Sequence, residues 1–156
     1  MTYEEWLAEV PTSITNDRLW QSEVYKMALF IGDLAWHDVR KLAKNISMRS
    51  LSDQLYRAVG SISANISEGF SRASGKDQAR FYEYALGSAC EYRDWYFKSR
   101  HVLTPRVIEH RLNLLARIIR QLLTIIPKYR TSTYLKEENT LYQVKESSNW
   151  QQDIPM

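Results

Sequence analysis

Six polar residues between positions 54 and 91 are those whose types and spacing could support chemistry. They lie on or beside the helical stripes that a bundle normally fills with Leu, Ile and Val. Two carboxylates near an arginine could act as general acid and base, but no nucleophile or metal-ligand cluster accompanies them in the sequence. Because buried polar groups are costly unless paired, we predict that the six form a mutual structural network rather than a catalytic site. They are Arg57, Ser61, Asn65, Glu68, Ser88 and Glu91.

The histidines add no recognisable catalytic or metal site. His37, His101 and His110 have no partner at metal-ligand spacing, and Glu109-His110 lacks the Glu-x-x-His step of di-iron bundles. A rival enzyme class, the HEPN-type ribonucleases, needs a longer spacing between Arg and His than the three residues that separate Arg106 from His110. We therefore predict a protein that is not an enzyme, has no catalytic residues and holds no cofactor or metal.

Length and composition are those of an ordinary globular chain. Its 156 residues suit one domain with flanking segments, and the 44% apolar and 25% charged content is typical of such domains. The apolar runs are too short and too charged to span a bilayer, and no signal peptide opens the chain. Cys90 alone cannot build a disulfide framework, and we expect it to be a small buried filler. These features favour a cytoplasmic protein without a membrane partner.

The net charge of +3 hides an asymmetry along the chain. Residues 1–17 contain four acidic and no basic residues, and residues 131–156 contain four acidic and two basic ones. Residues 18–130 therefore keep 19 of the 21 basic residues against 10 of the 18 acidic ones, a charge of +9. A basic body with acidic ends fits a polyanionic partner such as RNA or DNA. The alternative is a charge that only prevents aggregation.

Four long helical patterns follow a short one at the N-terminus. Thr2 and Glu5 have capping-box spacing and Pro11 ends the first helix, so 12–16 is expected to be a loop that leads to an N-cap at Asn16 or Asp17. Thr104 and Pro105 mark the start of the last helix, and Pro127 marks its end. Short connections predict an all-α, antiparallel up-down-up-down four-helix bundle. Its helices are expected at about 17–44, 50–68, 74–100 and 104–127.

These patterns divide the chain into three parts. Residues 1–16 form an acidic N-terminal extension, and residues 17–130 form the bundle. Residues 131–156 lose helical periodicity and are rich in Thr, Ser, Asn and Gln, which predicts a flexible polar tail with Trp150 as a candidate docking anchor.

Two helices carry more apolar surface than one bundle helix needs. In 17–44, a core stripe contains Val24, Met27, Ile31, Leu34, Ala35 and Leu42. A second stripe, roughly opposite, contains Tyr25, Leu29, Trp36 and Val39. In 104–127, the core stripe Ile108, Leu112, Leu115, Ile119, Leu122 and Ile126 is widened by Val107, Leu114, Ile118 and Ile125. We predict a homo-oligomer whose interface contains Tyr25, Leu29 and Trp36.

The two middle helices contain small and polar residues where a bundle would place larger ones. Asn65 falls in a coiled-coil seam, where asparagine often fixes register or oligomeric state, and Gly69 is expected to end its helix. The small-residue face of this helix, open to close approach by another backbone, contains Gly60, Ser63 and Ser67. The inward stripe of 74–100 is predicted to contain Phe81, Ala85, Ser88, Tyr92 and Trp95.

The basic residues are candidates for phosphate contact. On the last helix, Arg106, His110, Asn113, Arg117 and Arg120 share one stripe that we expect to face solvent. Most aromatic residues have core spacing, and we see no aromatic platform for single-stranded bases, so binding of low sequence specificity is expected. The candidate nucleic-acid-binding residues are Lys41, Lys44, Arg49, Arg72, Lys76, Arg80, Arg106, Arg117 and Arg120.

Part of the sequence resembles a known family of small bacterial four-helix-bundle proteins. The residues that agree in order and spacing are Gln54, Arg57, Ala58, Ser61, Ile62, Asn65, Ile66, Glu68, Gly69, Arg72, Gly87, Ser88 and Glu91. The family is that of the proteins from intervening sequences in large-subunit ribosomal RNA genes, and the accessory variability determinant of diversity-generating retroelements resembles it. The resemblance covers about 20–127, and it implies an up-down bundle that assembles as a ring-like homopentamer. The retroelement member is associated with nucleic acid and with its reverse transcriptase, and the resemblance implies such partners here.

The sequence thus predicts a non-enzymatic, homo-oligomeric scaffold that binds RNA or DNA through a basic surface. A reverse transcriptase or other nucleic-acid-processing enzyme is a candidate partner. The alternative is a protein–protein adaptor whose terminal segments recruit a partner without direct nucleic-acid binding.

Overall fold

A computed structural model describes residues 2–132, and within this range the regular structure is entirely helical. Residues 2–22 contribute three short elements, and the four long helices follow. The elements are α1 (Tyr3–Glu9), α2 (Thr12–Thr15), η1 (Arg18–Gln21), α3 (Glu23–Leu42), η2 (Ile46–Met48), α4 (Arg49–Phe70), α5 (Gly75–Lys98), η3 (Ser99–His101) and α6 (Pro105–Thr131). The predicted tail and its Trp150 lie outside the described residues, apart from 131 and 132.

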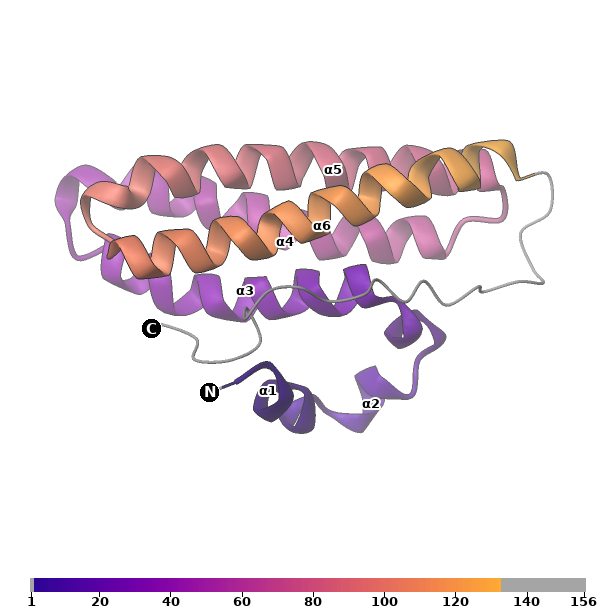
Figure 1. Cartoon of the computed structure of the whole chain (residues 1–156), viewed down its shortest axis with the longest axis horizontal. Coiled ribbons are helices and arrows are strands. Elements are labelled where there is room, and N and C mark those ends of the chain that lie inside the picture. The colour runs from indigo at the N-terminus through magenta and orange to yellow at the C-terminus, as the bar shows by residue number, and fades with distance from the viewer. Residues whose placement is uncertain (1, 133–156) are drawn as a thin grey trace.

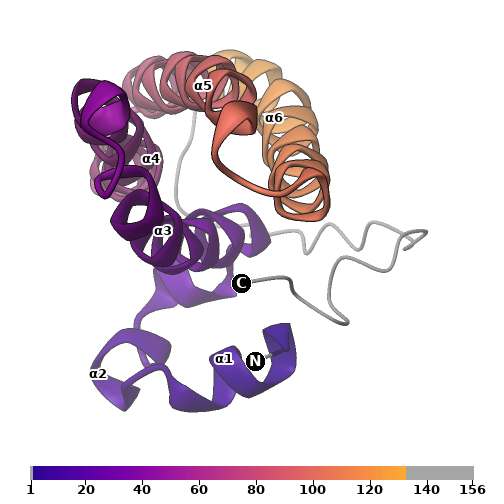
Figure 2. The same cartoon turned by 90° about the vertical axis from the view of Figure 1, so that its left-hand side faces the viewer.

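The long helices α3, α4, α5 and α6 run antiparallel in sequence order around a common core (Figure 1). Short connections place η2 and η3 at the same end of the bundle, on the left in Figure 1 and facing the viewer in Figure 2. We call this the η2/η3 end. The opposite end contains the α4–α5 connection and the C-terminus of α6, and we call it the α4–α5 end.

Side-chain caps begin several helices as the sequence predicts. The Thr2 hydroxyl accepts from the Glu5 amide while the Glu5 carboxylate accepts from the Thr2 amide, which completes the capping box of α1. Thr104 caps α6 by accepting from the Val107 amide, and Pro105 occupies the first helical position. The Asp17 side chain accepts from the Leu19 amide and caps η1.

Three expected helix boundaries are wrong. The predicted helix 17–44 is interrupted, because Ser22 has an extended backbone that separates η1 from α3. The predicted loop 12–16 contains the short helix α2. Pro127 does not end the last helix, since α6 continues to Thr131 and the Tyr129 ring packs edge-on against Tyr82, with 5.3 Å between ring centroids. Packing of the last turn outweighs the cost of an internal proline.

Gly69 also fails to end its helix, and its role is packing. The residue is buried near the end of α4, and a Cβ built on it would lie 2.9 Å from two ring carbons of Tyr82. Only a residue without a side chain lets α4 approach α5 this closely, and the helix ends instead at the C-cap Ser71.

The core confirms the first stripe of α3 and corrects two others. The core residues predicted for α3 are all buried. On α5 the inward stripe is rotated from its predicted position and contains Tyr82, Ala85, Ala89, Tyr92 and Tyr96. The additional apolar arc of α6 is not surplus surface, because Val107, Leu114 and Ile118 are buried within the protomer.

The N-terminal segment packs onto the outside of α3 (Figure 2). Tyr3 and Trp6 are buried, and their rings lie 5.0 and 5.1 Å from that of Phe30. The Trp6 indole Nε1 donates a 2.6 Å hydrogen bond to Asp33 Oδ2. Part of the acidic extension therefore contributes to the same core as the bundle.

Candidate nucleic-acid interface

The six polar residues predicted to form a network do not bond to one another across helices. Each polar side chain bonds within its own helix instead, apart from Glu68, whose partner lies just beyond the end of α4. Arg57 donates to Gln54, Ser61 to the Arg57 carbonyl, and Asn65 Nδ2 to the Ser61 carbonyl at 2.7 Å. Glu68 accepts from Arg72, Ser88 donates to the Tyr84 carbonyl, and Glu91 accepts from Trp95 Nε1. All six occupy exposed or half-buried positions. For Ser88 and Glu91 the reason is that the inward face of α5 differs from the predicted one.

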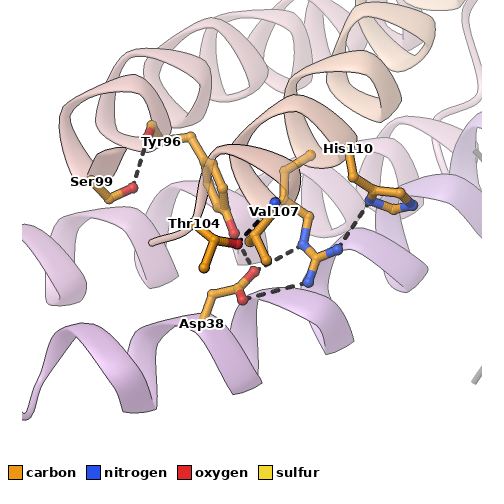
Figure 3. A network of polar contacts seen from close by, with 7 residues as sticks. Asp38, Tyr96, Ser99, Thr104, Val107 and His110 are labelled. Carbon is orange, nitrogen blue, oxygen red and sulfur yellow. Dashed lines mark hydrogen bonds and ion pairs between the residues drawn. The ribbon is translucent and has the colours of Figure 1, made fainter. Parts of the chain in front are cut away.

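The buried polar network involves other residues, which the sequence analysis missed. Asp38 on α3 and Arg111 on α6 are both fully buried. Figure 3 shows the polar contacts around Asp38. Arg111 Nε lies 2.9 Å from Asp38 Oδ2, and the Tyr96 hydroxyl donates to the same carboxylate oxygen. Three of the four long helices thus meet at one carboxylate. The sequence does contain a signal for this network, because residues seven positions apart share one face of a helix. Asp38 lies seven positions after the core residue Ile31, and Arg111 lies seven positions before Ile118.

His110 belongs to this network, although the solvent-facing stripe of α6 was expected to include it. It is only 9% exposed, and its Nδ1 lies 3.0 Å from Arg111 Nη1. Because a guanidinium can only donate, this contact requires Nδ1 to be the acceptor and the ring to be neutral. Its neighbours on that stripe, Arg106, Asn113 and Arg120, are exposed, and Arg117 is half-buried.

The electrostatics of the network suit a structural role. Burial alone would lower the pKa of Arg111, but the Asp38 carboxylate raises it, and the net direction is upward. Burial, followed by nearby charges, raises the pKa values of Tyr92 and Tyr96 well above that of a free tyrosine. Groups with no exposed surface cannot reach a substrate, so the network holds helices in place rather than performing acid–base chemistry. Within residues 2–132, no three His, Cys, Asp or Glu side chains gather into a potential metal site.

The η2/η3 end gathers four of the nine predicted phosphate-binding residues. Lys41, Lys44, Arg49 and Arg106 are all exposed there, although they come from α3, the following connection, α4 and α6. Three further cations lie at this end, and exposed carboxylates are fewer. The additional cations are Arg40, Lys98 and Arg100, and the nearby carboxylates are Asp53, Asp94 and Glu109.

The α4–α5 end holds Arg72, Lys76 and Arg80, which are also exposed. Near them lie two further cations, Lys128 and Arg130, and three carboxylates, Glu68, Asp77 and Glu83, so the excess of cations is smaller than at the η2/η3 end. Arg72 forms an ion pair with Glu68, and Arg130 forms one with Glu83. Paired carboxylates reduce the positive potential that a phosphate would meet. Of the two ends, the η2/η3 end is the better candidate for polyanion binding.

The residues predicted for the oligomer interface share the side of α3 that faces α4. Tyr25 and Leu29 are half-buried against the protomer's own core, and Trp36 is 50% exposed. The Trp36 ring lies 6.0 Å from that of Tyr56, which is also exposed. Gly32 and Gly60 on the two helices have open space where a Cβ would stand.

Comparisons with known proteins agree with this all-helical architecture. A crystal structure of a protein of unknown function from the S23 ribosomal protein family of Bacteroides thetaiotaomicron superposes with a TM-score of 0.62 at 25% identity. The match covers 66% of this chain and 97% of that one. A search of curated proteins gave no match. In the part of the chain that the structure describes, no helix is long and apolar enough to cross a membrane. The profile of the 23S rRNA-intervening sequence protein family matches residues 21–124, and the chain therefore belongs to that family.

Proposed function

We propose that this protein is a non-enzymatic scaffold that binds RNA or DNA through the η2/η3 end of its bundle. The observation that carries the proposal is the concentration of seven cationic side chains from α3, α4, α5, η3, α6 and the α3–α4 connection at that end. Cations from separate elements that converge on one surface act together on a phosphate backbone. The family name, which refers to 23S rRNA, supports a role connected with RNA.

The mechanism is neutralisation of backbone phosphates with release of their counterions. Such binding depends on positive charge and on the spacing of phosphates, and it carries little sequence information. Log affinity should therefore fall linearly with log salt concentration, with a slope of roughly −0.9 per neutralised phosphate for a duplex. Fluorescence anisotropy with labelled RNA at several salt concentrations measures this slope. Absence of binding at low salt, or binding that does not respond to salt, would overturn the proposal.

We further propose that copies of the chain associate through the side of α3 that contains Tyr25, Leu29 and Trp36. The half-exposed Trp36 and the neighbouring Tyr56 support this, because paired exposed aromatic rings are typical of protein interfaces. Assembly into a ring would repeat the basic η2/η3 end once in each subunit. The number of subunits, five, is taken from the family resemblance. Native mass spectrometry of the parent and of Trp36→Ala tests the proposal. A monomeric parent at micromolar concentration would rule it out.

We also propose that the scaffold binds a protein partner. The retroelement relative suggests a reverse transcriptase or another nucleic-acid-processing enzyme, and nuclease-treated pull-downs would separate direct contact from tethering through RNA. The adaptor alternative expects that deletion of 131–156 abolishes partner capture while assembly stays intact.

A further inference from the structure

Two aromatic side chains at the η2/η3 end are each covered by a cation. Phe97 is 53% exposed, and the guanidinium carbon of Arg100 lies 4.1 Å from its ring centroid. Trp95 is half-buried on the same helix, and the Lys98 ammonium lies 4.2 Å from its ring. Both pairs belong to the last turn of α5 and to η3. These elements lead into the connection to α6, at the end of the bundle that faces the viewer in Figure 2.

We propose that this turn is a stacking platform for unpaired nucleobases. The ligand class is single-stranded RNA or DNA, with a base stacked on the exposed Phe97 ring and phosphates held by the surrounding cations. Trp95 is two residues away on α5 and therefore lies on the opposite flank of the helix, packed against the core. This inference rests on the proposed function and narrows its ligand. It departs from the expectation, based on the core spacing of most aromatic residues, that the chain has no such platform.

The physical reason is that only an unpaired base can offer its face to a protein ring. In a duplex the base faces are stacked on one another, so a duplex can use the cations but not the rings. An exposed phenyl ring beside a guanidinium provides both an aromatic surface and a positive charge that can turn toward a phosphate. Loss of one base–aromatic contact typically weakens single-strand binding by about 5- to 150-fold.

The carboxylates near the platform do not cancel its charge. Glu91 accepts a 3.1 Å hydrogen bond from Trp95 Nε1, which fixes the orientation of the indole. Asp94 lies 3.6 Å from Lys98 Nζ, and both side chains are largely exposed. Exposed pairs of this kind are weak, so a phosphate can displace Asp94 from Lys98.

The test measures binding of a fluorescein-labelled oligouridylate and of a blunt RNA duplex of equal length to the full chain at low salt. Phe97→Leu keeps apolar volume and charge but removes the aromatic face. We expect its dissociation constant for the single strand to rise by about 5- to 150-fold, with the duplex value and both salt slopes unchanged. Phe97→Tyr should retain parental affinity. Thermal unfolding verifies that each variant folds.

Tyr84→Leu is the matched control, because Tyr84 is 51% exposed on the same helix but lies toward its middle, against Phe81. Its single-strand affinity should equal that of the parent. If the parent binds both probes and Phe97→Leu changes neither, nucleic-acid binding stands and the stacking platform is overturned. The platform is also overturned if Phe97→Leu and Tyr84→Leu weaken single-strand binding equally. If the parent binds neither probe, the proposed function itself fails.

Discussion

Arg111 on α6 and Asp38 on α3 form an ion pair that has no exposed surface, although 73 residues separate them in the sequence. The Tyr96 hydroxyl of α5 donates to the same carboxylate oxygen, so one buried group joins three helices. Removing two charges from water is expensive, and the pair offsets this cost only in its observed geometry. A sliding or rotated α6 would leave both charges buried and unpaired. The pair therefore specifies how α3, α5 and α6 are aligned.

Removal of one member of this pair should be severe. Arg111→Met keeps the side-chain length but leaves the Asp38 carboxylate buried without its cation, and we expect a loss of about 3–5 kcal/mol in the free energy of unfolding. Urea denaturation followed by circular dichroism measures it. Asp94→Asn, which breaks the exposed pair with Lys98, is the control and should cost less than about 1 kcal/mol. Equal losses in the two variants would contradict the structural role of the buried pair.

The two tyrosines beside the ion pair should differ in how much stability the protein loses when their hydroxyl groups are removed. Tyr96→Phe removes the hydrogen bond to Asp38 and should destabilise the protein by about 1–3 kcal/mol. The Tyr92 hydroxyl is buried and has no hydrogen-bond partner among residues 2–132. Tyr92→Phe removes a polar group that gains nothing in the folded state, so stability should stay unchanged or rise. Thermal unfolding of the two variants decides the matter, and a larger loss for Tyr92→Phe would show that its hydroxyl is bonded.

Alkaline pH should unfold the protein because four of its buried tyrosines lose their protons less readily in the folded state. Burial, the largest cause, raises the pKa values of Tyr3, Tyr82, Tyr92 and Tyr96 in the folded state above the ordinary value of 10.0. The folded chain then binds more protons than the unfolded chain above that pH, so stability is complete below it and falls as pH rises further. Tyrosinate absorbance of these residues should appear together with loss of circular dichroism. In Tyr96→Phe, stability should fall less steeply with pH; an unchanged slope would contradict this assignment.

The existence of the long helices follows from the sequence, because their apolar residues repeat at three- and four-residue steps. Their ends follow only where a local signal decides, as at Thr104 and Pro105. At Gly69, close packing against Tyr82 overrides the preference of glycine for a helix end. At Pro127, the packing of Tyr129 on Tyr82 holds the last turn of α6 beyond the proline. Such contacts join residues that are distant in the chain, and no local pattern reports them.

The site was less predictable than the fold. Helix α5 carries aromatic residues all around, so Phe81 and Trp95 compete with Tyr82 and Tyr96 for the inward face, and periodicity cannot choose between them. The assignment of the inward face also determined which polar residues of α5 were predicted to be buried, namely Ser88 and Glu91. Lys44 and Arg106 were identified individually from the sequence, and the antiparallel arrangement brings them to the same end of the bundle. Arg40, Lys98 and Arg100, which lie at that end too, were not identified from the sequence.

Two glycines on neighbouring helices should respond in opposite directions to alanine. A Cβ at Gly69 would lie 2.9 Å from the Tyr82 ring, so Gly69→Ala should force α4 and α5 apart and cost about 1–3 kcal/mol. Gly87 lies inside α5 with open space where its Cβ would stand, and Gly87→Ala should stabilise the helix by about 1 kcal/mol. Urea denaturation provides both values. A stabilised Gly69→Ala variant would refute the close approach of the two helices.

The two ends of the bundle should differ in nucleic-acid binding when equal charge is removed from each. Lys44→Gln with Arg49→Gln removes two cations from the η2/η3 end, and Lys76→Gln with Arg80→Gln removes two from the α4–α5 end. All four side chains are exposed, so neither double variant should disturb the fold. The first variant should bind labelled RNA more weakly, and the slope of log affinity against log salt should become shallower by about 1 to 2.

The second variant is the matched control, because its net charge equals that of the first. Its affinity and salt slope should remain near parental values, since the carboxylates of Glu68 and Glu83 already lower the potential at that end. Equal weakening of both variants would mean that binding depends on total charge rather than on one end of the bundle. The location proposed here would then be wrong, although the protein would still bind nucleic acid.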